Sequence, residues 1–111
     1  MKKVVWLCSW YPNRIQPFLG DFIERHAIAT SQYAHISALH VTRTYDKTIE
    51  ESCLSEKKIN NDHLRAEIIY CNVRAKPGIY SRVKQYVQYF RQHIRWVENY
   101  IAVHGKPELI H

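Results

Sequence analysis

Side chains suited to binding a sugar or a phosphate gather in one short loop, residues 9–20, between an apolar segment and a helical segment. Aromatic rings stack on sugars, and an arginine guanidinium pairs with phosphate oxygens. A glycine directly before a helix lets the backbone approach an anion. The predicted substrate-binding residues are Tyr11, Asn13, Arg14, Phe18 and Gly20.

Each of these residues also has a purely structural interpretation. The aromatic rings of Trp10, Tyr11 and Phe18 would cover the core, and Arg14 would be solvated. Gly20 would supply a positive φ angle in a tight turn. The sequence leaves both interpretations open.

The segments that must position this loop follow an α/β pattern. Strands are expected at 3–8, 36–42, 66–73 and 108–111, and helices at 22–34 and 80–104. Asp21 is predicted to cap the first helix, with Glu24 three residues further on, and Ser81 to cap the second. The polar residues 43–65 are expected to form a surface excursion with a helical turn at 48–57.

This element order predicts a Rossmann-like domain with a mostly parallel sheet in the strand order 3-2-1-4. Ligands of such sheets bind beyond the carboxyl ends of the strands, where the strand order reverses. The loop 9–20 and His111 should therefore meet at that edge. His111 is the predicted catalytic residue, because a histidine there can contact sugar hydroxyls or transfer a proton.

Composition sets the broad class. A chain of 111 residues with 46% apolar residues fits one domain, and its net charge of +6 favours anionic partners. The three cysteines show no metal-ligand spacing, so no metal site is expected. The start Met1-Lys2-Lys3 precedes only five apolar residues, which predicts a cytoplasmic protein.

Two stretches resemble the N-terminal domain of a GT-B glycosyltransferase of family 4. The first runs from Trp10-Tyr11-Pro12-Asn13 through Pro17-Phe18-Leu19-Gly20-Asp21-Phe22-Ile23-Glu24-Arg25-His26-Ala27 to His35-Ile36-Ser37-Ala38-Leu39-His40-Val41. The second is Lys106-Pro107-Glu108-Leu109-Ile110-His111, which is similar to the family's strand ending in histidine.

The resemblance implies two Rossmann-like domains that face each other across a cleft. The N-terminal domain mainly holds the acceptor, and the C-terminal domain mainly holds a nucleotide-sugar donor. Sugar transfer proceeds with retention and usually without metal. The family's phosphate-facing glycine corresponds to Gly20, and its strand-end histidine to His111. Leu19 and Glu108 depart from the family's usual glycine and aspartate.

The long helix carries a second hypothesis. Its residues Val83, Val87, Phe90, Ile94, Val97 and Ile101 form one apolar stripe at helical spacing. Lys84, Arg91 and Arg95 lie on one flank, and Tyr89, Trp96 and Tyr100 on the other. The prediction is that the helix contacts the anionic inner face of the cell membrane through Lys84, Arg91, Arg95 and Trp96. The alternative is that the aromatic flank packs against the sheet or the surface excursion, and that the cations are simply solvated.

The sequence thus predicts that residues 1–111 are the acceptor-side domain of a larger retaining glycosyltransferase, inactive alone. Its function would lie in polysaccharide or glycolipid biosynthesis, with a nucleotide-sugar donor, a glycan or lipid-linked acceptor and no cofactor. The alternative is a small flavodoxin-like module that binds a nucleotide or phosphate without chemistry. The chain lacks the motifs of zinc-finger and RNA-binding domains, so no nucleic-acid partner is expected.

Overall fold

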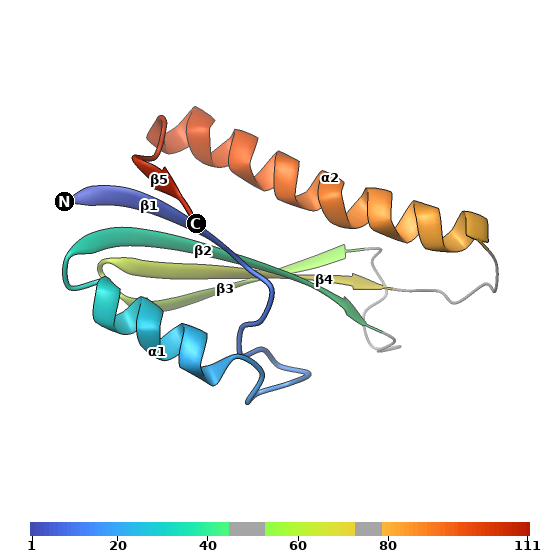
Figure 1. Cartoon of the computed structure of the whole chain (residues 1–111), viewed down its shortest axis with the longest axis horizontal. Helices are drawn as coiled ribbons and strands as arrows, with labels where there is room; N and C mark the ends of the chain where they lie inside the picture. The colour runs from blue at the N-terminus through green and yellow to red at the C-terminus, as the bar shows by residue number, and fades with distance from the viewer. Residues whose placement is uncertain (45–52, 73–78) are drawn as a thin grey trace.

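The computed structural model describes residues 1–44, 53–72 and 79–111, which form an α/β fold with one mixed sheet (Figure 1). The elements in chain order are β1 (Lys2–Cys8), α1 (Asp21–Thr30), β2 (Ala34–Thr44), β3 (Cys53–Asn61), β4 (Leu64–Asn72), α2 (Ile79–His104) and β5 (Leu109–Ile110). Helix α1 covers one face of the sheet and α2 lies over the other.

The five strands lie in the order β3-β4-β2-β1-β5. Strand β1 pairs in parallel with both β2 and β5, β2 pairs in parallel with β4, and only β3 is antiparallel. The order therefore differs from the predicted four-stranded sheet by an additional edge strand. The four predicted strands correspond to β1, β2, β4 and β5.

The additional strand corrects the prediction for residues 43–65. Residues 53–61 form β3 rather than part of a surface excursion, and the predicted turn at 48–57 lies partly outside the described residues. The burial of β3 alternates along its length, as expected of an edge strand with one solvated face. Lys58, on its inner face, forms an ion pair with Glu24 of α1.

The start of α1 also differs from the prediction. Gly20, not Asp21, is the N-cap residue, and no side chain caps the helix. Asp21 is already in the first turn and pairs with Arg25 at 3.0 Å. Glu24 is occupied by Lys58 rather than by the N-terminal backbone. The helix ends at Thr30, four residues before the predicted end, because the following residues turn into β2.

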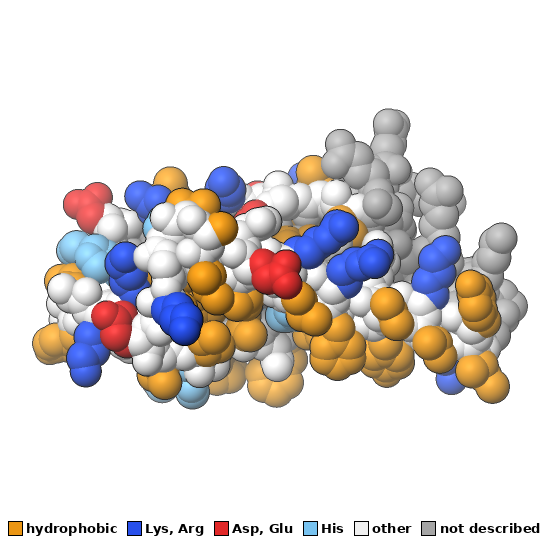
Figure 2. All heavy atoms as spheres, turned by 90° about the horizontal axis from the view of Figure 1, so that it is seen from above, with side chains coloured by type: hydrophobic (Ala, Val, Ile, Leu, Met, Phe, Trp, Pro, Cys, Tyr) orange, Lys and Arg blue, Asp and Glu red, His pale blue; other side chains and the backbone are white. Residues whose placement is uncertain are grey.

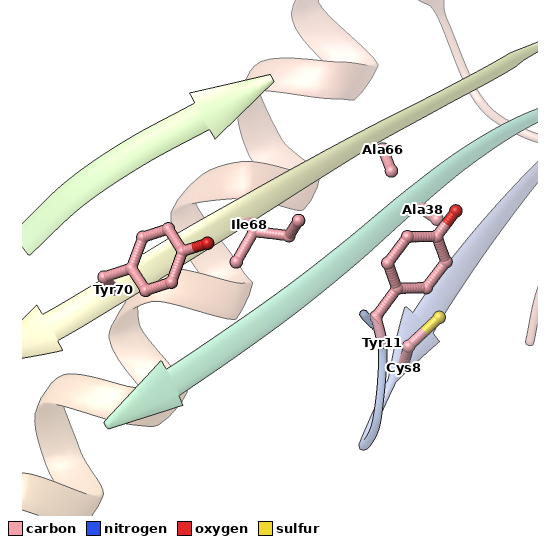
Figure 3. Packing of buried hydrophobic residues seen from close by; sticks show 6 residues of the cluster. All are labelled: Cys8, Tyr11, Ala38, Ala66, Ile68 and Tyr70. Carbon is pink, nitrogen blue, oxygen red and sulfur yellow. The ribbon is translucent and has the colours of Figure 1, made fainter. Parts of the chain in front are cut away.

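The core in the described residues has two clusters on the face under α1 and one under α2. Under α1, the side chains of Cys8, Tyr11, Ala38, Ala66, Ile68 and Tyr70 pack together (Figure 3). A further cluster on that face contains Val4, Ala27, Ala34, Ile36 and Leu64. Under α2, the buried residues are Leu39, Val41, Ile69 and Cys71.

Helix α2 contacts the sheet with its aromatic flank. Tyr89 and Trp96 pack on the cluster under α2, Tyr100 is buried, and the Trp96 indole donates to the Glu67 carboxylate. The prediction that Trp96 faces a membrane is therefore wrong, and the alternative that this flank packs on the sheet is confirmed. Helix α2 begins at Ile79, so Ser81 lies inside it and is not its N-cap.

Candidate functional site

A cavity of about 440 Å³ opens beside the carboxyl ends of β1 and β2, where the loop 9–20 leaves the sheet. Ligands of open α/β sheets bind at this edge, and the strand order reverses at β1, which leads into Ser9 of the cavity lining. Helix α2 supplies one wall of the cavity. Its lining residues are Ser9, Leu19, His40, Val41, Thr42, Arg43, Tyr86 and Tyr89.

A larger cavity of about 710 Å³ lies between α2 and the sheet, and its lining includes Ser37 and Arg65 near the amino ends of β2 and β4. Its half-buried carboxylate, Glu67, already accepts hydrogen bonds from Ser55 and Trp96. This position is away from the strand ends where ligands of such sheets bind. The smaller cavity is therefore the better candidate.

His40 is the chemically distinctive group of the smaller cavity. Its side chain is only 4% exposed, and Nδ1 lies 3.1 Å from the carbonyl oxygen of Cys8. A carbonyl can only accept, so Nδ1 carries the proton, and Nε2 keeps a free lone pair. The described residues give this buried Nε2 no hydrogen-bond partner.

Burial lowers the pKa of His40, the Cys8 carbonyl opposes this shift, and the neighbouring His93 adds slightly to it. The ring is therefore neutral at physiological pH. A neutral imidazole with a free lone pair can accept a hydrogen bond or a proton from a ligand hydroxyl. Sequence reasoning assigned no role to His40, although its place near the end of the second strand was a usable signal.

Tyr11 and Asn13 are buried and stabilise the conformation of the loop. Tyr11 is 1% exposed and packs in the cluster under α1. Asn13 is also buried: its Nδ2 donates to the carbonyl of Tyr11 at 3.0 Å, and its Oδ1 accepts from the backbone N–H groups of Ile15 and Gln16 at 3.0 and 2.9 Å. The polar groups of Asn13 are thus engaged within the loop.

Gly20 holds the end of the loop against its beginning. Its φ angle is +69°, and a Cβ atom there would lie 2.7 Å from the carbonyl carbon of Trp10. Both features require glycine, which supports the structural interpretation of this residue. They also leave the first turn of α1 beside the loop backbone, where N–H groups are available to an anion.

Arg14 and Phe18 are the predicted binding residues that remain open to a ligand. The backbone N–H of Arg14 donates to the Tyr70 hydroxyl at 3.0 Å, while its exposed guanidinium lies 5.3 Å from the centre of the Tyr70 ring. Phe18 is 89% exposed, and Trp10, at the start of the same loop, is 53% exposed. Exposed aromatic rings and an exposed arginine in one loop suit a sugar or a sugar phosphate.

His111 is held at the same edge of the sheet by the backbone of β1. Its N–H donates to the carbonyl of Val5, and its own carbonyl accepts from Leu7, both at 2.8 Å. Its ring lies edge-on to Trp6, 5.5 Å between centres. The structure thus brings His111 and the loop to neighbouring strand ends, but neither His111 nor any of the five predicted binding residues lines the cavity itself.

Metal ligands do not gather anywhere in residues 1–44, 53–72 and 79–111: no group of three or more His, Cys, Asp or Glu side chains there could hold an ion. Cys53 and Cys71 face each other across β3 and β4 with their sulfur atoms 2.8 Å apart, and both are free thiols. Cys8 is buried, and burial raises the pKa of its thiol to about 11. Its thiol is therefore protonated and not poised as a nucleophile.

The lowered pKa of His40 predicts a pH dependence of stability. The pKa of His40 in the folded protein is below the unfolded value of about 6.5. The stability that comes from keeping His40 neutral is therefore present above about pH 6.5 and is lost as the pH falls, because the unfolded chain takes up the proton first. The free energy of unfolding should decrease between pH 7.5 and 5.5. In His40→Asn, which keeps a donor for the Cys8 carbonyl, this decrease should be smaller.

Urea unfolding of both proteins at the two pH values measures this difference. The control is His26→Asn, since His26 is exposed on α1 and should leave the pH dependence unchanged. Equal pH dependence in the wild type and in His40→Asn would show that His40 is not held neutral by its burial.

Comparison of the chain with protein-family models, with curated proteins and with solved structures finds no match in any of the three.

Proposed function

We propose that this chain is the acceptor-side, Rossmann-like domain of a retaining glycosyltransferase that uses a nucleotide-sugar donor. The main support is where the fold places the two stretches that resemble the family. The two stretches that resemble the GT-B family are about ninety residues apart, yet the first begins just after β1 and the second contains β5, which pairs in parallel with β1. The start of the first stretch and the end of the second thus lie at the edge where α/β sheets bind ligands.

The second stretch is fixed to β1, the strand that leads into the first stretch, by specific contacts. The Glu108 backbone N–H donates to the carbonyl of Lys3 at 2.9 Å, and the Lys3 N–H donates to the Glu108 carboxylate at 2.6 Å. These contacts lower the pKa of Glu108 and keep it ionised. Glutamate at this position therefore performs a structural task that supports the strand pairing.

In this proposal each residue contacts the part of the substrates that suits its chemistry. The exposed rings of Trp10 and Phe18 stack on the acceptor, and Arg14 binds an anionic group on it. His40 accepts a hydrogen bond from an acceptor hydroxyl and orients it. His111 contacts the transferred sugar, and the backbone at Gly20 and the first turn of α1 faces the donor diphosphate. The other wall of the cleft, with the donor pocket, belongs to the second domain of the family.

NMR titration of the 111-residue chain tests the acceptor assignment against the nucleotide-binding alternative. The probes are octyl glycosides on one side, and UDP, GDP and inorganic phosphate on the other. We expect octyl glycosides to shift the amide signals of Ser9, Leu19, Thr42 and Arg43, and His40→Asn to weaken this effect. Nucleotides should cause no shift below about 1 mM.

Two results would contradict the proposal. Micromolar binding of a nucleotide or phosphate at the same signals would favour the flavodoxin-like module. No shift with any octyl glycoside at about 10 mM would remove the acceptor role, because acceptor sites commonly bind in the millimolar range or tighter.

A further inference from the structure

Helix α2 leaves its predicted apolar stripe in solvent. Its sheet contacts come from Tyr89, Trp96 and Tyr100, and at 3.6 residues per turn the stripe is centred about 120° further round the helix. Val83, Val87, Phe90 and Ile94 are 54%, 57%, 60% and 58% exposed. Further exposed apolar residues on α2 are Ile79, Tyr80, Tyr86, Ile101 and Val103.

One edge of this stripe is basic. Lys84, Arg91 and Arg95 are exposed along the helix, and in Figure 2, which looks down on α2, Lys and Arg side chains lie beside the row of hydrophobic side chains. Glu98 is the one acidic residue of α2. The salt bridges found in the described ranges, Arg25–Asp21 and Lys58–Glu24, both lie outside α2.

We propose that this face of α2, defined by Val83, Val87, Phe90 and Ile94 with Lys84 and Arg91, docks on an anionic lipid surface. An interfacial helix has this composition: an apolar stripe that enters the acyl boundary, and cations beside it that contact anionic headgroups. The charge favours a bilayer over a second copy of the chain, because two copies would bring their basic edges together.

Docking by this face does not require a spanning helix. Within the described residues, no helix has the length and hydropathy needed to cross a bilayer. Docking would also bring the candidate site close to the lipid surface, since Tyr86 and Tyr89 of α2 line its cavity. The inference rests on the exposure and charge of α2, so it stands or falls independently of the proposed sugar transfer.

Vesicle co-sedimentation tests the docking. The 111-residue chain should bind vesicles of phosphatidylglycerol and phosphatidylcholine at low salt, and bind pure phosphatidylcholine about tenfold or more less tightly. The double variant Phe90→Ser/Ile94→Ser should lower the partition coefficient about tenfold or more, and so should Lys84→Glu/Arg91→Glu. Raising the salt concentration should weaken binding of the wild type.

Two controls match these variants. Tyr33→Ser/Ile59→Ser removes two apolar side chains that are 79% and 71% exposed away from α2, and Lys2→Glu/Lys106→Glu makes the same charge change elsewhere. Both should retain most of the binding. Circular dichroism checks that each variant is folded. In the unaltered chain, anionic bicelles should broaden the amide signals of residues 83–94 first.

Several results would overturn the inference. The first is no binding of the wild type to anionic vesicles at low salt. The second is an equal loss of vesicle binding in the α2 variants and in the controls. The third is broadening by bicelles of amide signals outside residues 83–94 only. A dimer in sedimentation equilibrium that Phe90→Ser/Ile94→Ser converts to monomer, without vesicle binding by the wild type, would assign the face to a second copy instead.

Discussion

Gly20→Ala should lower the free energy of unfolding by about 2 to 4 kcal/mol, because two costs add at this position. The backbone has φ +69°, where any residue with a Cβ is strained. The new methyl group would also lie 2.7 to 2.9 Å from Trp10 carbonyl carbon, Cβ and carbonyl oxygen. Backbone atoms cannot move aside cheaply, since the buried ring of Tyr11 holds the loop in place.

Gly105→Ala is the matched control. Gly105 has φ +79° but no atom within 4 Å of an added Cβ. Gly105→Ala should therefore lower the free energy of unfolding by about 1 kcal/mol, from backbone strain alone. Urea unfolding of the two variants separates the contributions. Equal losses would mean that the contact between Gly20 and Trp10 does not shape the loop.

Tyr11→Ala should cost about 3 to 5 kcal/mol, whereas Tyr11→Phe should leave stability unchanged or raise it by up to about 1 kcal/mol. The ring of Tyr11 belongs to the buried cluster under α1, where it lies beside Cys8 (Figure 3). Its hydroxyl is buried, and the described residues give it no hydrogen-bond partner. Burial, with a smaller contribution from Glu24, raises the pKa of this phenol, so it remains neutral.

Chemical denaturation of the two variants measures this contrast, with Tyr33→Phe as the exposed control. A loss in Tyr11→Phe as large as about 2 kcal/mol would show that the hydroxyl has a bonding partner in the folded protein. A small loss in Tyr11→Ala would show that the loop does not depend on this ring.

The predicted strands and helices depended on strong local signals. The runs around Val5, Leu39 and Ile68 are apolar enough to be buried in a parallel sheet, and all three are buried. The breaks at Gly105 and Pro107 end α2 where expected. Strand β3 was missed because Glu56, Lys57 and Lys58 read as a solvated loop. Only tertiary contacts, with β4 and with Glu24, make this charged segment an edge strand.

The sequence predicted that the loop and His111 lie near each other at one edge of the sheet, but not which residues line the cavity there. The loop and His111 do lie at neighbouring strand ends, as the topology required. Sequence alone could not show that the Asn13 side chain hydrogen-bonds to the backbone of its own loop, or that the ring of His40 is buried beside the cavity. Such roles depend on which face of a strand or loop a side chain takes.

The orientation of α2 shows the same limit. Its period of three and four residues predicted the apolar stripe, yet Phe90 and Ile94 are exposed while Trp96 and Tyr100 pack on the sheet. Two faces of this helix are apolar enough to pack. Their difference is that Trp96 can satisfy its indole N–H with Glu67 of β4, and no sequence period encodes that pairing.

The most direct test of the central claim is sugar transfer by the protein that the complete reading frame encodes, assayed with a panel of labelled nucleotide sugars. We predict transfer with retention of anomeric configuration, a loss of about a hundredfold or more in His40→Asn and His111→Ala with the fold intact, and no transfer by residues 1–111 alone. The matched surface variant His26→Asn should retain activity. Absence of transfer from every donor, or transfer by residues 1–111 alone, would contradict the assignment of this chain as an acceptor-side domain.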